Sequence, residues 1–218
     1  MSETPHPRPQ PPPEARLAQR LEAKETPRRS AIVNVLHELA DLDAAAYRAI
    51  AETPMPTLDE PLRQLSELAN NSKLWLAIAG GLFVLGGRTG RRAALTGAAA
   101  IAINSAIVNL PMKLAGRRER PDRGGIGVPK RRWVEMPTST SFPSGHSASG
   151  FAFASAVAGT LPIAALPLRG LAAAIAYSRV HTGVHYPGDV VVGSLIGVTI
   201  GEATAMVARG IHRRRQRA

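Results

Sequence analysis

The sequence predicts an all-α protein, an integral-membrane helical bundle with about five transmembrane helices preceded by amphipathic helices. Most of residues 74–112 and 144–208 consists of Ala, Gly, Leu, Ile and Val, whereas both ends of the chain are polar and basic. Apolar segments of this kind predict helices inside a membrane. The mean hydropathy of −0.04 averages over the two kinds of segment and therefore conceals the division.

The N-terminal part lacks long apolar segments. Residues 1–30 are predicted to form a disordered, Pro-rich basic tail, because they offer too little apolar surface to offset the cost of ordering. We expect no secretory signal peptide, since no apolar run follows the basic start. Residues 31–72 are predicted to form amphipathic interfacial helices, interrupted by Pro54, Pro56 and Pro61. Two soluble helices packed on each other are the alternative for this segment.

Residues 73–208 are predicted to form the transmembrane domain. Its expected spans are 74–85, 93–112, 147–161, 171–180 and 190–208. A hydrocarbon core of about 30 Å requires about 20 residues, so the short first span is expected to use residues 70–73 as well. The last span carries a glycine seam on one face, formed by Gly193, Gly197 and Gly201. The seam predicts close packing within the bundle, and a dimer contact is the alternative.

The basic loops predict the orientation of the chain. Arginines in 88–92, Arg169 and the basic tail 209–218 all fall on one side of a five-span bundle, which the positive-inside rule assigns to the cytoplasm. The segment 113–146 is also strongly basic and would lie outside, together with the basic N-terminal tail. The first exception is accounted for if some of those cations have a chemical role.

Composition excludes several kinds of chemistry. The chain has no cysteine, so it has neither disulfides nor a thiolate nucleophile nor a Cys-based metal site. The net charge of +11 suits nucleic acid, anionic lipid or phosphorylated substrates. We expect no nucleic-acid partner, because short basic ends commonly flank membrane spans.

Three short segments combine cations or imidazoles with turn-forming residues, each at the edge of an apolar span and all on the same expected side. The first has a Lys and an Arg separated by six residues, the second is Pro-Ser-Gly-His, and the third is an Arg followed by a His and an Asp. The residues concerned are Lys113, Arg120, Ser144, Gly145, His146, Arg179, His185 and Asp189.

Together the three segments resemble the signature of the type 2 phosphatidic acid phosphatase superfamily, over about residues 70–208. The resemblance implies a membrane phosphatase that hydrolyses a lipid phosphate or diphosphate without a metal or other cofactor. Candidate substrates are polyprenyl diphosphate, phosphatidate, phosphatidylglycerophosphate and a polyprenyl-linked sugar phosphate. The short five-span layout resembles the bacterial polyprenyl diphosphatase branch. It implies a multi-pass protein of the bacterial cytoplasmic membrane with its active site on the outer face.

The residue types of the three segments suit phosphate chemistry. A phosphate ester is an anion, and Lys113, Arg120 and Arg179 would supply cations for its oxygens. Backbone N–H groups at Ser144 and Gly145, where a helix is expected to begin, would add uncharged donors.

The histidines supply the candidate catalytic groups. Neutral His185 could attack phosphorus and form a phosphohistidine, and Asp189 would hold the proton of its second ring nitrogen. His146 would protonate the leaving group. His181 and Tyr186 are expected only to line the pocket.

The same residues allow other interpretations. Two His and an Asp also resemble a metal site, but three nearby cations would repel a divalent ion, so we expect no metal. A vanadate-dependent peroxidase relative and a non-enzymatic basic membrane protein that binds anionic lipid are the alternative functions. The other basic residues of the loop are expected to be interfacial anchors, namely Arg117, Arg118, Arg123, Lys130, Arg131 and Arg132.

Overall fold

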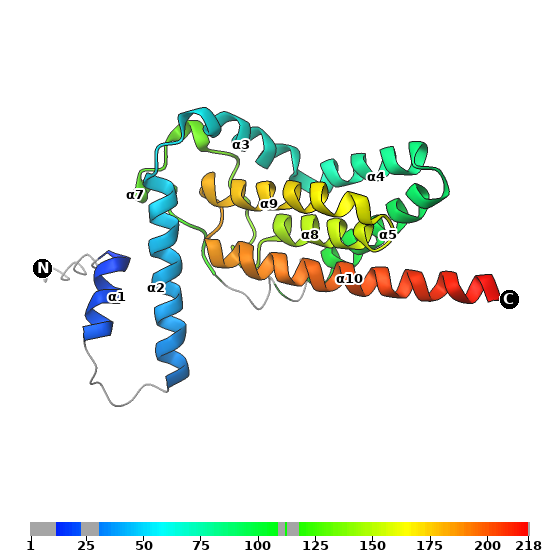
Figure 1. Ribbon diagram of the computed structural model, residues 1–218. Coiled ribbons are helices and arrows are strands. Elements are labelled where there is room, and N and C mark those ends of the chain that lie inside the picture. The colour runs from blue at the N-terminus through cyan, green and yellow to red at the C-terminus, as the bar shows by residue number, and fades with distance from the viewer. Residues whose placement is uncertain (1–11, 23–30, 109–111, 113–117, 218) are drawn as a thin grey trace, which may run out of the picture. The chain divides into compact units, whose positions relative to one another are not determined.

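The computed structural model describes residues 12–22, 31–108, 112 and 118–217, and the regular structure of these residues is helical (Figure 1). The elements in chain order are α1 (Pro13–Glu22), α2 (Ala31–Glu52), α3 (Pro56–Leu68), η1 (Asn70–Ser72), α4 (Lys73–Leu85), α5 (Gly87–Ile107), α7 (Arg123–Ile126), η3 (Lys130–Arg132), α8 (Gly145–Ala158), η4 (Pro162–Ala164), α9 (Ala165–His181) and α10 (Pro187–Arg217). The all-α membrane architecture is confirmed.

The chain divides into two compact units, Met1–Ala49 and Ile50–Ala218. In the first unit, α1 and α2 are joined by two ion pairs, Arg16 with Asp41 at 3.3 Å and Arg48 with Glu14 at 2.8 Å. The first part of the segment 31–72, for which helices are predicted, is helical as α2. The division into a tail, interfacial helices, a transmembrane domain and a basic tail stays a prediction.

The second unit is built around α8. This helix packs against α5, α9 and α10, and Figure 1 shows α8, α9 and α10 running side by side. Most α8 residues are buried, as expected for a helix with small, mostly apolar side chains on every side. The aromatic rings of Trp75 and Phe153 lie 5.3 Å apart between centroids, in a core that also contains Ile175.

The glycine seam of α10 faces α8. A Cβ atom added at Gly193 would meet the carbonyl oxygen of Ser144, and one at Gly197 would meet that of Ala148. Gly201 lies equally close to the Ala152 carbonyl. The two helix backbones therefore approach more closely than any side chain would allow, and packing within the bundle is confirmed.

Two described helices are long and apolar enough to cross a membrane, Pro162–His181 and Pro187–Arg217. The helices Pro56–Leu68 and Asn70–Leu85 meet at a bend of 62° and would count as a third span together. The expected total of about five spans stays a prediction.

The breaks around α3 have local causes. The chain leaves the helix only between Glu52 and Pro56, and Pro61 lies inside α3 and does not interrupt it, contrary to expectation. At the other end, Asn71 and Ser72 adopt positive φ angles of 54° and 56°, which no continuous right-handed helix accommodates. This turn redirects the chain from α3 into α4.

Candidate active site

His185 lies in the turn between α9 and α10 with only 2% of its surface exposed. Gly183, at a φ of 72°, allows the turn, and the backbone N–H of His185 donates to the Arg179 carbonyl at 3.2 Å. This turn places the imidazole beside the first turn of α10, where Asp189 is located.

The carboxylate of Asp189 faces one ring nitrogen of His185. Its Oδ2 lies 3.6 Å from His185 Nδ1, and Ser141 Oγ lies beside both atoms, at 2.5 Å from Oδ2 and 3.4 Å from Nδ1. The backbone N–H of Tyr186 also donates to Oδ2, at 2.9 Å. Negative charge on this side favours a proton on Nδ1, which leaves a lone pair on Nε2.

Arg120 faces the other ring nitrogen. Its Nη1 lies 3.3 Å from His185 Nε2 and 2.6 Å from the Val184 carbonyl. The rest of the guanidinium is held by hydrogen bonds that Nε donates to the Ser139 carbonyl and that Nη2 donates to Ser139 Oγ and the Thr140 carbonyl. A guanidinium cannot accept a hydrogen bond, so this contact also requires an unprotonated Nε2. Burial lowers the pKa of Arg120, and the charge of Asp189 opposes that shift.

The surroundings keep His185 neutral. Burial is the main cause that lowers its pKa, to about 4, and the charges of Arg120 and Arg179 add to the effect. Contact with Asp189 acts in the opposite direction and is outweighed. Near neutral pH the imidazole is therefore in the form that can act as a nucleophile.

Arg179, in the last turn of α9, is 1% exposed. Its Nη1 donates to Ser66 Oγ at 2.6 Å and to the Ser66 carbonyl at 3.2 Å. Its buried Nε has no hydrogen-bond partner among the described residues. A buried donor of this kind is costly unless a ligand completes it, which suits an anion-binding role.

Ser144 and Gly145 form the start of α8, as predicted. Ser144 is the N-cap residue, and its Oγ accepts from Ser147 Oγ at 3.0 Å. Its own backbone N–H donates to the Asp189 carbonyl at 3.0 Å, which joins α8 to α10. The next N–H groups lie in the first turn, where a helix has no partners of its own to offer them.

His146 also lies in this turn, and its Nε2 is 2.9 Å from Asn70 Oδ1. It borders a cavity of about 440 Å³ between η1, α4, α5 and α8. Direct contacts thus join His185, Asp189 and Arg120, whereas His146 is held from η1. Lys113 lies outside the described residues.

Several basic residues interpreted as interfacial anchors have structural partners. Arg118 forms an ion pair with Asp189 Oδ1 at 2.9 Å and lies 4.0 Å from the Tyr186 ring centroid. Arg132 is fully buried against Asp59 at 2.6 Å, and Arg131 pairs with the same carboxylate. The anchor interpretation is wrong for Arg118 and Arg132, because their charges pair with the buried carboxylates of Asp189 and Asp59. For Arg131, whose side chain is 56% exposed, it stays a prediction.

A polar face on α3 and η1 was not predicted from the sequence. Asp59, Ser66 and Asn70 contact, in that order, His181 at 2.9 Å, Arg179 at 2.6 Å and His146 at 2.9 Å. Their spacing of seven and then four residues places them on one side of a helix and was a usable signal. Ser141, in contrast, lies in an irregular loop where no spacing rule applies.

The helical membrane bundle, with a buried histidine between a carboxylate and a guanidinium, defines a membrane enzyme of phosphate chemistry. A sequence model of the PAP2 superfamily matches residues 93–212, more than half of the chain. The chain therefore belongs to the PAP2 superfamily. It is a membrane phosphatase that needs no metal ion.

Relatives and solved structures agree with this assignment. Decaprenylphosphoryl-5-phosphoribose phosphatase of Mycobacterium tuberculosis is 36% identical over 160 residues, 71% of this chain and 83% of the relative. The protein of the same name from Mycolicibacterium smegmatis is 37% identical over 131 residues, covering 60% and 68%.

Two crystal structures share the fold with a TM-score of 0.58 each. One is the transmembrane PAP2 type phosphatidylglycerolphosphate phosphatase from Bacillus subtilis, 20% identical, with 93% of this chain and 94% of the other covered. The second is Aquifex aeolicus LpxE, 28% identical, with 75% and 94% covered. The match to almost the whole length of both proteins supports one shared bundle.

Proposed function

We propose that this phosphatase removes the phosphate monoester from a sugar carried on a polyprenyl phosphate, through a phosphohistidine on His185. The substrate class rests on the relatives that are 36% and 37% identical, since both are named for such a substrate. It was one of the candidates expected from the sequence. The competing substrate is a polyprenyl diphosphate, which the short five-span layout of the sequence favours.

In the first step, Nε2 of His185 attacks phosphorus. The N–P bond forms as the P–O bond to the sugar breaks, and the sugar oxygen takes a proton from His146. Asp189 stabilises the positive charge that develops on the imidazole ring. In the second step, water attacks phosphorus, its proton passes to His146, and the N–P bond breaks to release inorganic phosphate.

The observation that carries this mechanism is the contact of 3.3 Å between Arg120 and Nε2. It places a cation where the equatorial phosphate oxygens would lie during attack, and the unpartnered Nε of Arg179 offers a second donor. Lys113 and the first N–H groups of α8 would complete the set of donors.

A chemical-trapping experiment tests the mechanism. Purified protein is mixed with substrate carrying radioactive phosphorus and quenched in alkali, and label on the protein is counted. We expect labelled wild-type protein, and no label or turnover with His185→Ala. His37→Ala, in α2, serves as the matched control. Full phosphatase activity in His185→Ala would refute the mechanism.

A substrate panel tests the specificity separately. Release of inorganic phosphate is compared for a polyprenyl-linked sugar phosphate, a polyprenyl diphosphate, phosphatidate and phosphatidylglycerophosphate. We expect the highest kcat/KM for the first. A higher value for the diphosphate would reject the proposed substrate and leave the phosphohistidine step intact.

We also propose that the protein lies in the bacterial cytoplasmic membrane with its active site on the outer face, as the basic loops suggest. The chain has no cysteine, so single cysteines can report on sidedness. In intact cells, a membrane-impermeant maleimide should label Glu135→Cys but not Gln216→Cys. The opposite labelling pattern would invert the orientation.

A further inference from the structure

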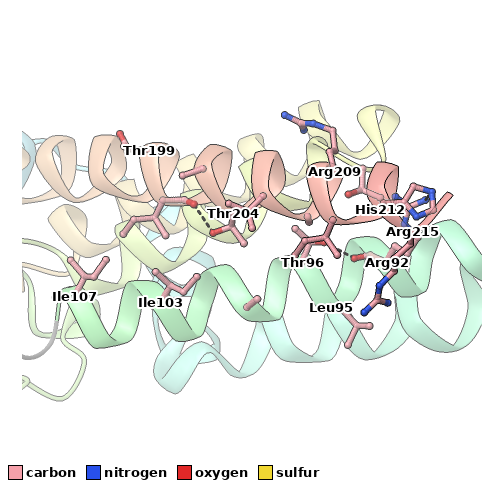
Figure 2. Close-up of a pocket in the computed structure, with 17 residues that line it drawn as sticks. Arg92, Leu95, Thr96, Ile103, Ile107, Thr199, Thr204, Arg209, His212 and Arg215 are labelled. Carbon is pink, nitrogen blue, oxygen red and sulfur yellow. Dashed lines mark hydrogen bonds between the residues drawn. The ribbon is translucent and has the colours of Figure 1, made fainter. Parts of the chain in front are cut away.

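A long groove runs between α5 and α10, away from the candidate active site. Its volume is about 830 Å³. Side chains of the two helices line it along its length, among them Ile103 and Thr204, and Arg92, Arg209 and Arg215 line it toward one end. In Figure 2 the Arg209 guanidinium lies on the side of α10 away from α5. The groove therefore has an apolar body and a cationic end.

The body of the groove is apolar even where threonines line it. Thr96 donates its hydroxyl hydrogen to the Arg92 carbonyl at 2.8 Å, and Thr204 donates to the Ile200 carbonyl at 2.7 Å. Because each hydroxyl is bonded within its own helix, the threonines can present methyl groups to the groove. Leu95 and Val207, at 61% and 63% exposure, add large apolar surface that no other side chain of the described chain covers.

The cationic end lacks anionic partners. Arg92 lies 3.0 Å from His212 Nε2, and Arg209 donates to the Gly159 carbonyl at 3.2 Å. None of Arg92, Arg209 and Arg215 forms an ion pair with a carboxylate of the described residues, and no acidic residue lines the groove. Three arginines therefore line one end of an apolar channel without a carboxylate partner among the described residues.

The dimensions of the groove fit one leaflet of a bilayer. From Leu95 to Ile107 the α5 wall rises by about 18 Å, close to half of a hydrocarbon core of about 30 Å. Along α10, Arg209 lies about 30 Å from Asp189, a full core thickness. The cationic end thus lies at the membrane face opposite His185, beyond the reach of a substrate phosphate bound there.

We propose that this groove binds an anionic phospholipid of the leaflet opposite the active site. The headgroup phosphate contacts Arg92, Arg209 and Arg215, and an acyl chain lies along the apolar body between α5 and α10. Guanidinium groups bind phosphate oxygens in pairs, which suits a phosphodiester headgroup. The site belongs to the membrane-facing surface and does not depend on the identity of the substrate.

Native mass spectrometry of the full-length protein tests the proposal. The protein is released from vesicles of phosphatidylcholine with phosphatidylglycerol, and bound lipid is counted. The test variant is Arg92→Gln/Arg209→Gln/Arg215→Gln. The matched control, Arg88→Gln/Arg213→Gln/Arg217→Gln, removes the same charge near the same helix ends from residues that do not line the groove.

We expect the test variant to bind phosphatidylglycerol roughly a hundredfold more weakly, since each Arg near an anionic headgroup contributes to affinity. The control should bind like the wild type. Ala203→Trp, which fills the groove without changing charge, should also lose the lipid. Turnover in neutral detergent within about twofold of wild type would show that each variant is folded.

Three results would overturn the proposal. The first is undiminished phosphatidylglycerol binding by the test variant, and the second is an equal loss in the control, which would mean unspecific attraction to charge. The third is efficient disulfide formation between two copies of Ile103→Cys in phosphatidylcholine bilayers, because a second copy would then occupy the groove.

Discussion

The surroundings of His185 suit the nucleophilic role that we propose for it. Side chains of opposite charge lie next to its two ring nitrogens, a carboxylate near Nδ1 and a guanidinium near Nε2. The carboxylate selects the tautomer, and the guanidinium together with burial disfavours the doubly protonated ring. In the proposed mechanism the same guanidinium binds the phosphate that the nitrogen attacks.

The pH profile should report this environment. The pKa of His185 is lowered to about 4, so protonation removes the nucleophile only below that pH. We expect kcat/KM to fall on the acid side with a midpoint near 4, not near 6.5, the usual value for histidine. The measurement is kcat/KM in detergent from about pH 3.5 to 8. A midpoint near 6.5 would contradict the described surroundings of His185.

Residue spacing predicted part of this site. The structure brings together Arg120, His185 and Asp189, which the three segments singled out. Residue spacing could not reveal Ser141, because the partners of a hydroxyl in a loop depend on how distant segments fold together. Spacing also could not distinguish Arg132, which is buried against Asp59, from exposed arginines nearby, because the presence of a charged residue in the sequence does not tell whether it is buried.

At the scale of elements, α3 and η1 act as a polar support for the site. Asp59, Ser66 and Asn70 share a face, and each contacts a histidine or arginine on α8 or α9. The polar stripe was overlooked because polar residues on an amphipathic helix are ordinarily solvated.

The contact between Ser66 and Arg179 can be tested alone. Ser66→Ala removes an acceptor from a buried guanidinium, at a cost of about 1–3 kcal/mol. We expect KM to rise roughly tenfold as Arg179 loses its fixed position. Ser66→Thr, which keeps the hydroxyl, should restore most of the affinity, and Gln64→Ala on the exposed side of α3 is the control. Equal KM values for all variants would show that Ser66 does not position Arg179.

The glycine seam of α10 gives a prediction about stability. At Gly197 a Cβ atom would overlap the Ala148 carbonyl, so Gly197→Ala must push α10 away from α8. Overpacking of this kind typically costs about 1–3 kcal/mol. Gly210→Ala, on the same helix but with nothing within 4 Å of the added atom, is the matched control. Thermal unfolding in detergent should show a lower Tm for the first variant only.

At the scale of the whole molecule, the division at Ala49 separates a small helical unit from the unit that contains every described site residue. The second unit nevertheless needs the end of α2. The buried guanidinium of Arg132 donates to the carbonyls of Ala51 at 3.1 Å and Thr53 at 2.7 Å. These acceptors complete a cluster that also holds Asp59 and His181.

Two truncations should therefore differ. Removal of residues 1–30 leaves the second unit intact and should keep turnover within about twofold, because no described site contact is lost. Removal of residues 1–55 deprives Arg132 of its carbonyl acceptors, and breaking a buried charge network of this kind typically costs about 3–5 kcal/mol. Phosphate release and Tm, measured for both proteins, decide between these outcomes. Equal loss in both would mean that the first unit is itself required.

The polar contacts from α3 and η1 also limit which segments of this enzyme can be exchanged for those of a relative. The segment that matches the PAP2 superfamily begins at residue 93, whereas Ser66 and Asn70 lie before it. A chimera that grafts only residues 93–212 onto another N-terminal half would keep every signature residue and yet leave Arg179 and His146 without these neighbours. We therefore expect the segment that full activity requires to extend before the segment that the superfamily model matches.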